Sequence, residues 1–121
     1  MRLPETMRAL RKLAPGEGLE LAEVPVPAVG PDDVLVRVTA SSICGTDVHI
    51  YNWDAWSAGR IRPPVTLGHE FAGEVAAAGE RVLDLPLGTP VSAEGHVLLG
   101  GARHVVPGQE HLARDMEVLG I

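Results

Sequence analysis

The stretch GHEFAGEVAAAGERV, residues 68–82, decides how this chain folds. Phe71, Gly73 and Val75 alternate along it, and this period of two predicts a long β-strand. The alanine run that follows leaves a helix open as the alternative. The glycine directly before His69 would let the backbone approach a site closely.

The segment VLVRVTA, residues 34–40, predicts a second strand. Val34, Val36 and Val38 would share one face of it. Shorter strands are expected in three further segments, at residues 7–13, 19–24 and 91–99. Ten prolines and fourteen glycines spread along the chain indicate many turns. These features together favour antiparallel β structure over alternating strands and helices.

Three segments between these strands are not expected to be strands. Residues 44–53, CGTDVHIYNW, carry polar and apolar residues at helical spacing and predict a short helix. Residues 51–56 and 59–68 are expected to be loops, the second because Pro63 and Pro64 exclude a helix. The predicted fold class is therefore mainly β, with short helices.

Length and charge limit the class of protein. The 121 residues are expected to form one domain, 1–121, with an ordinary hydrophobic core. A net charge of -6 argues against nucleic-acid binding, which needs a basic surface. No segment predicts a membrane span or a signal peptide, and the lone cysteine excludes an intramolecular disulfide. A cytoplasmic location is expected.

Cys44, His69 and Glu70 offer a thiolate, an imidazole and a carboxylate, which are the ligand types that zinc prefers. A catalytic zinc site uses three protein ligands and keeps one position open. Taken alone, this set leaves two readings open. A single cysteine is often a small buried hydrophobe, and a His-Glu pair is often surface decoration.

CGTDVHI, residues 44–50, followed by the stretch at 68–82, resembles the zinc-containing medium-chain alcohol dehydrogenases. The second segment matches the zinc motif of that family at each defined position: Gly68, His69, Glu70, Gly73, Gly79 and Val82. The sequence between the two motifs, and VSAEGH at residues 91–96, is similar to the corresponding segments of the L-threonine 3-dehydrogenases in this family. The resemblance runs from Met7 to Ile121.

The resemblance implies a fold and a set of roles. The fold would be a partly open GroES-like β-barrel with short helices. Cys44 and His69 would bind one catalytic zinc, and Glu70 would bind or release it. Thr46 would take the proton of an alcohol or amino-acid substrate, His49 would pass it to solvent, and His96 would shape specificity. Zinc would lower the pKa of the bound alcohol, and hydride would pass to NAD.

The chain also departs from the family pattern. It contains no G-x-G-x-x-G motif and no βαβ alternation, so no NAD site is expected in it. The distal acidic residue of the threonine enzymes has no counterpart here, which predicts weaker zinc binding. The chain alone is therefore expected to be inactive.

The family's structural zinc lobe has four cysteines, and apolar residues occupy those positions here: Leu99, Ala102, Val105 and Ala113. Without thiolates, a structural zinc cannot be held, and His104 and His111 alone make a poor closed site. A competing alignment treats residues 100–109 as a later strand of the barrel, with the lobe deleted.

The missing dinucleotide motif and the missing cysteines suggest an alternative. The chain would then be a minimised or engineered barrel that serves as a scaffold or metal-binding module without dehydrogenase activity. A co-chaperonin-like module has less support, because it has no use for the ligand motifs. The face that packs on a cofactor domain would be apolar, which predicts self-association into a homo-oligomer. Trp53 and Trp56 would line a cleft there or pack in the core.

Overall fold

The computed structural model of this chain describes residues 2–93, 96–98 and 116–118. In this part, eight strands and two helices follow in the order β1 (Thr6–Lys12), β2 (Glu20–Pro25), β3 (Val34–Ser41), α1 (Gly45–Asn52), α2 (Ala55–Arg60), β4 (Val65–Thr66), β5 (Phe71–Ala78), β6 (Pro90–Ser92), β7 (His96–Leu98) and β8 (Met116–Val118). The prediction of a mainly β fold with short helices is confirmed.

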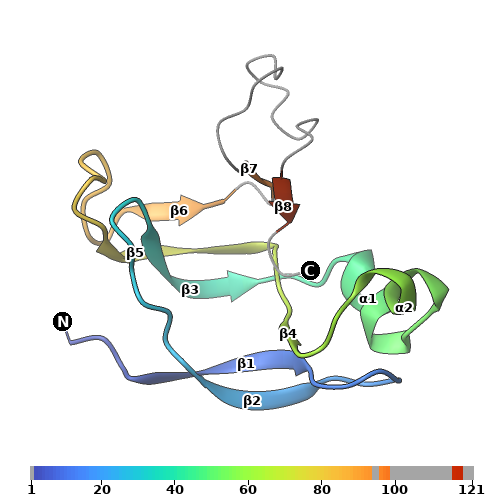
Figure 1. Cartoon of the computed structure of the whole chain (residues 1–121). Helices are drawn as coiled ribbons and strands as arrows, with labels where there is room; N and C mark the ends of the chain where they lie inside the picture. The colour runs from blue at the N-terminus through green and yellow to red at the C-terminus, as the bar shows by residue number, and fades with distance from the viewer. Residues whose placement is uncertain (1, 94–95, 99–115, 119–121) are drawn as a thin grey trace.

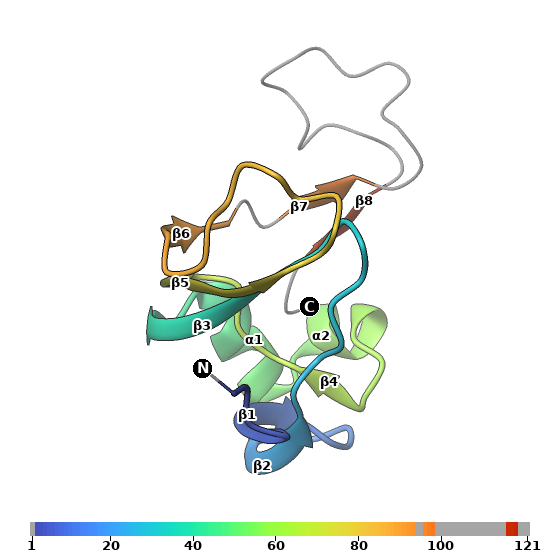
Figure 2. The same cartoon turned by 90° about the vertical axis from the view of Figure 1, so that its left-hand side faces the viewer.

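The described strands form three small sheets, with strand orders β2-β1-β4, β3-β5-β6 and β7-β8. All of their pairings are antiparallel. Figure 1 shows the β1–β2 hairpin on one side of the molecule, the β3–β5 pair on the other, and α1 and α2 together at one end. The perpendicular view keeps the hairpin and the β3–β5 pair in separate layers (Figure 2).

The strand predicted from the opening stretch is β5, and the helix alternative for its alanines is wrong. β5 pairs with β3 over nearly its whole length, and a local irregularity falls between Val38 and Ala40. Gly73 allows the close approach there, since a Cβ at this position would lie 2.3 Å from the Arg37 carbonyl oxygen. The three valines of β3 line one open cavity of ≈ 600 Å³ together with Phe71, which confirms their shared face.

Two segments expected to be loops contain regular structure. Residues 55–60 form α2, because Asp54 caps it: the Asp54 side chain accepts a hydrogen bond from the Ser57 amide at 2.9 Å. Residues 65 and 66 form β4, which pairs with the end of β1. A helix of six residues and a strand of two leave almost no periodic pattern in a sequence.

Lys12, the last residue of β1, is buried with 2% of its surface exposed. Its ammonium donates to the carbonyls of Gly16 and Gly18, and at 3.4 Å to that of Tyr51 near the end of α1. Its Nζ also lies 5.4 Å from the centre of the Trp53 ring. One side chain thus ties the turn after β1 to the C-terminal end of α1. The buried apolar residues of the described part are few: Ala9, Ile50, Ile61 and Val75.

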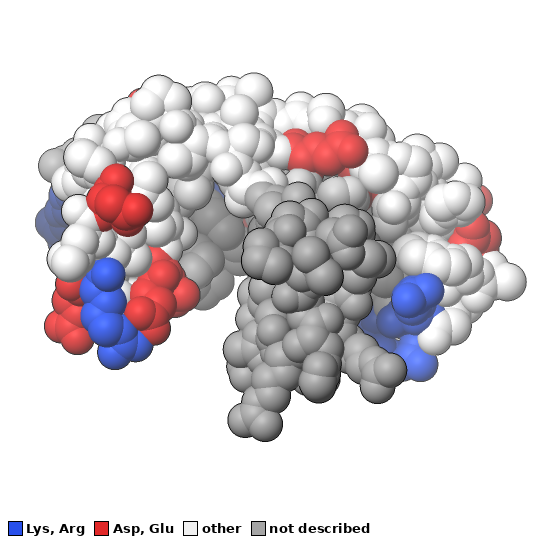
Figure 3. Space-filling view, turned by 90° about the horizontal axis from the view of Figure 1, so that it is seen from above, with Lys and Arg blue, Asp and Glu red and all other residues white. Residues whose placement is uncertain are grey.

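Neither helix of the described part is long and apolar enough to cross a membrane. On the face shown in Figure 3, acidic and basic side chains lie in small separate groups, and most of the described surface is uncharged.

Candidate metal centre

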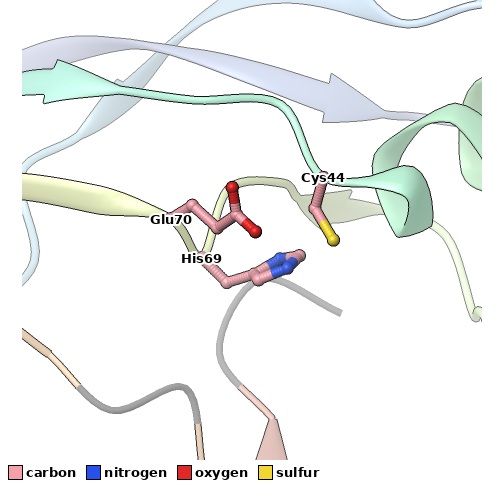
Figure 4. A group of neighbouring side chains, drawn as sticks. All are labelled: Cys44, His69 and Glu70. Atoms are coloured by element: carbon pink, nitrogen blue, oxygen red, sulfur yellow. The ribbon is translucent and has the colours of Figure 1, made fainter.

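Cys44, His69 and Glu70 come together at one end of the β3–β5 pair. One ligand atom from each side chain lies within 4.8 Å of the other two. Cys44 precedes α1, whereas the other two precede β5, and Figure 4 shows the three side chains pointing toward a common point. The antiparallel pairing of β3 and β5 produces this meeting, because it places the residues after β3 beside those before β5.

Local backbone structure positions Cys44 and His69. Cys44 is the N-cap of α1, with extended backbone, and its amide donates to the Asp47 carboxylate at 2.9 Å. Gly68 has φ +116°, a conformation that favours glycine. A Cβ at Gly68 would meet no protein atom within 4 Å, so crowding by the chain itself does not require glycine here, and the close approach of this backbone to a bound group stays a prediction. The turn before His69 needs this glycine for its backbone angle.

Ser42 adjoins this cluster through Glu70 and is not among the site residues that the sequence predicts. Its hydroxyl donates to Glu70 Oε2 at 2.6 Å, and its amide donates to the Glu70 carbonyl at 2.9 Å. The hydroxyl bond holds the pKa of Glu70 below its ordinary value; burial opposes this, and contacts with Cys44 and His69 reinforce it. Glu70 is thereby kept ionised, as a metal ligand must be. A serine in a loop carries no sequence pattern that would reveal this role.

The donor set fits a zinc ion. Within the described residues, the buried Nδ1 of His69 has no hydrogen-bond partner. A buried polar atom without a partner is costly in a protein interior, and a bound metal or an ordered water would remove that cost. Cys44 and His69 are partly buried while Glu70 is exposed, so the part of the chain that the structure describes leaves the site open on one side. Thiolate, imidazole and carboxylate ligands with an open side are typical of catalytic zinc.

The other predicted site residues lie at different distances from this cluster. Thr46 is in the first turn of α1, and its hydroxyl oxygen lies 3.7 Å from the Cys44 sulfur. His49 follows on the same helix with 60% of its side chain exposed, and its Nδ1 contacts the Asp54 carboxylate. His96 begins β7, where its backbone pairs with Val118.

Several predictions concern the tail, outside the described residues. These are the side chain of His96, the four positions that replace cysteines, His104 and His111, and the choice between the two tail alignments. The two tryptophans are described and differ from each other. Trp53 is half-buried against Lys12. Trp56 is 40% exposed and lies beside the His49 ring and the Arg60 guanidinium group.

Known proteins are similar in sequence over nearly the whole chain. The family model for the alcohol dehydrogenase GroES-like domain matches residues 30–121. An L-threonine 3-dehydrogenase of Symbiobacterium thermophilum is 54% identical over 119 residues, which cover 98% of this chain and 34% of that protein. The enzyme of the same name from Cutibacterium acnes is 49% identical over 94% of this chain and 33% of its own length. The chain therefore spans about a third of the length of these relatives.

Solved structures agree with the sequence matches. The alcohol dehydrogenase of Thermus sp. ATN1 superposes with a TM-score of 0.78 at 36% identity, over 94% of this chain and 32% of that one. Galactitol-1-phosphate dehydrogenase from Escherichia coli gives a TM-score of 0.80 at 26% identity, over 94% and 32%. The predicted GroES-like fold and the predicted resemblance to L-threonine 3-dehydrogenases are confirmed. The chain belongs to the alcohol dehydrogenase GroES-like domain family.

Proposed function

We propose that residues 1–121 form the zinc-binding catalytic domain of an NAD-dependent alcohol dehydrogenase whose substrate is L-threonine. The convergence of Cys44, His69 and Glu70, with ligand atoms within 4.8 Å, carries the zinc part of this assignment. The choice of threonine is supported by the two relatives named above, which are 54% and 49% identical to this chain.

Cys44 and His69 would hold the zinc, and Glu70 would be a third ligand oriented by Ser42. When bound, zinc lowers the pKa of a hydroxyl that it contacts and so makes an alcohol easier to oxidise. The chain's own side chains would then handle the proton. The Thr46 hydroxyl lies 3.7 Å from the Cys44 sulfur and would accept the proton of the substrate.

His49 would carry that proton onward. Residues three apart on a helix lie on the same face, so Thr46 and His49 are neighbours along α1. An imidazole that is largely exposed can exchange protons with solvent, and histidine is the side chain suited to this at neutral pH. His96 would contribute to the choice of substrate, as in the resemblance to the threonine enzymes.

Zinc binding can be tested on the purified chain by metal analysis and isothermal titration. We expect one zinc per chain, and we expect Cys44→Ala and His69→Gln to lose most of the affinity. His49→Gln is the matched control, because it removes an imidazole outside the ligand set and should leave zinc binding unchanged. A parent chain that takes up no zinc would contradict the assignment and favour the scaffold alternative.

The dehydrogenase part has a separate test. The sequence has no dinucleotide-binding motif, so the 121-residue chain with zinc, NAD and L-threonine is expected to form no NADH. Sustained NADH formation would show that the chain binds NAD by other means.

Self-association is part of the proposal. Exposed apolar side chains lie close to the site in the sequence: Ile43 is 80% exposed and Val48 50%. Apolar groups exposed beside a functional site favour contact with another protein surface. Light scattering across a concentration series should show dimers or larger species, and a monomer at every concentration would contradict this point.

A further inference from the structure

We propose that Asp54 is a positioning residue for His49: it keeps the proton on Nδ1 and so leaves Nε2 as the nitrogen that exchanges a proton. This rests on the proposed function, in which His49 passes the substrate proton to solvent. Nothing in the sequence motifs points to Asp54, which lies at the start of α2, and its role follows from contacts in the structure alone.

The backbone brings Asp54 to His49. Trp53 ends α1 in the left-handed conformation, with φ 54° and ψ 48°, and this turns the chain back over the last turn of the helix. The Asp54 amide then donates to the His49 carbonyl at 3.4 Å. The Asp54 carboxylate reaches the ring of the same histidine, and its Oδ2 contacts Nδ1.

The two carboxylate oxygens of Asp54 have different partners. Oδ1 accepts the hydrogen bond from the Ser57 amide at 2.9 Å and thereby caps α2, while Oδ2 faces the imidazole. The cap fixes the carboxylate in space, because it anchors one oxygen to the helix end. The bond from Ser57, reinforced by the contact with His49, holds the pKa of Asp54 below its ordinary value, so the group is ionised near neutral pH.

An ionised carboxylate can only accept hydrogen bonds. The neutral His49 ring must therefore carry its proton on Nδ1, and Nε2 is left with a free lone pair. On another side, the ring lies against Trp56, with centroids 6.0 Å apart and planes tilted by 52°. Contacts from α2 thus limit rotation of a ring that is otherwise largely exposed.

This arrangement suits a proton relay. A relay histidine must accept a proton on one nitrogen while its orientation stays fixed, and a carboxylate on the other nitrogen provides that orientation. The accepting atom is Nε2. Asp54 keeps its charge throughout and does not take the proton itself.

The test is the tautomer of neutral His49, read from the ¹⁵N shifts of its ring in long-range ¹H–¹⁵N spectra of the zinc-free chain. The spectra are recorded at the alkaline end of a pH titration, where these shifts no longer change. A His49→Gln sample assigns the signals. We expect the Nδ1–H form to exceed the Nε2–H form by about tenfold, the ratio that one hydrogen bond of ordinary strength supports. A parent chain in which Nε2–H predominates would overturn the inference, whether or not the variants fold.

Two variants separate positioning from capping. Asp54→Asn can keep the cap through its amide oxygen and would turn its NH₂ toward Nδ1, so His49 should switch to the Nε2–H form. Asp54→Ser also keeps a good cap but removes the partner, and should give a mixture of tautomers. Circular dichroism confirms that the helices persist. An unchanged tautomer in Asp54→Asn would also overturn the inference, and because no metal is present, this outcome is independent of zinc binding.

Discussion

Replacing Lys12 by Met should destabilise the domain without changing its fold. Lys12 has only 2% of its surface exposed, and its ammonium donates to the Gly16 carbonyl at 2.5 Å and to the Gly18 carbonyl. Met fills a similar volume with an unbranched apolar chain, so packing is largely kept. The variant therefore isolates the loss of the charged donor.

The size of the loss in unfolding free energy depends on which carbonyl groups lose a hydrogen-bond donor. The Tyr51 carbonyl still accepts from the Gly18 amide at 2.8 Å, so the carbonyls of Gly16 and Gly18 are the ones affected. A hydrogen bond from a charged group contributes about 1.5–3 kcal/mol. Both glycines are only half-buried, so water can replace part of each bond. Burial also lowers the pKa of Lys12, because enclosing the charged form has a cost. We therefore expect the free energy of unfolding to fall by about 2 kcal/mol in Lys12→Met.

The measurement is urea unfolding followed by far-UV circular dichroism, with linear extrapolation to water. Arg8→Met on the same strand is the matched control, because Arg8 is exposed and its loss should change stability by no more than about 0.5 kcal/mol. If Lys12→Met unfolds at the same urea concentration as the parent, the carbonyl contacts contribute nothing and the reasoning is refuted.

Three other changes have distinct expected outcomes. Gly73→Ala should destabilise by about 1–3 kcal/mol, because its Cβ would lie 2.3 Å from a β3 carbonyl oxygen, whereas Gly59→Ala, with nothing within 4 Å, should be neutral or stabilising in thermal unfolding. Ser42→Ala should weaken zinc binding by about tenfold in titrations, because it removes the hydrogen bond that holds the Glu70 carboxylate in place, whereas Ser41→Ala should not. Equal zinc affinities of Ser42→Ala and the parent would exclude a role of Ser42 in orienting Glu70. Asp54 has a folded-state pKa below 3.8, so its stabilising effect is present above that pH and is lost as the pH falls through the folded value. The Tm advantage of the parent over Asp54→Asn should therefore shrink as the pH falls below about 5, and a constant difference would contradict the shift.

Local pattern determined much of the fold. Alternating residues predicted β3 and β5, and the short apolar runs predicted β1 and β2, because a strand with one buried face repeats every two residues. The ligand types at Cys44, His69 and Glu70 were also readable from the sequence, together with a family motif. The family resemblance singled out these three residues, since neither spacing nor composition distinguishes a metal ligand from an ordinary polar residue on the surface.

Tertiary structure alone decided which residues support those ligands. Ser42 meets Glu70 across 28 positions of sequence, and Lys12 reaches Tyr51 across 39. Such contacts depend on strand register and turn geometry, which place distant segments together and leave no periodic trace. The pairing of His49 with Asp54 is close in sequence, yet it depends on the left-handed turn at Trp53, an unusual conformation for a bulky residue. The sequence by itself thus specified the longer strands and indicated the candidate metal ligands. Long-range register and one uncommon backbone turn specified the contacts that orient Glu70 and His49.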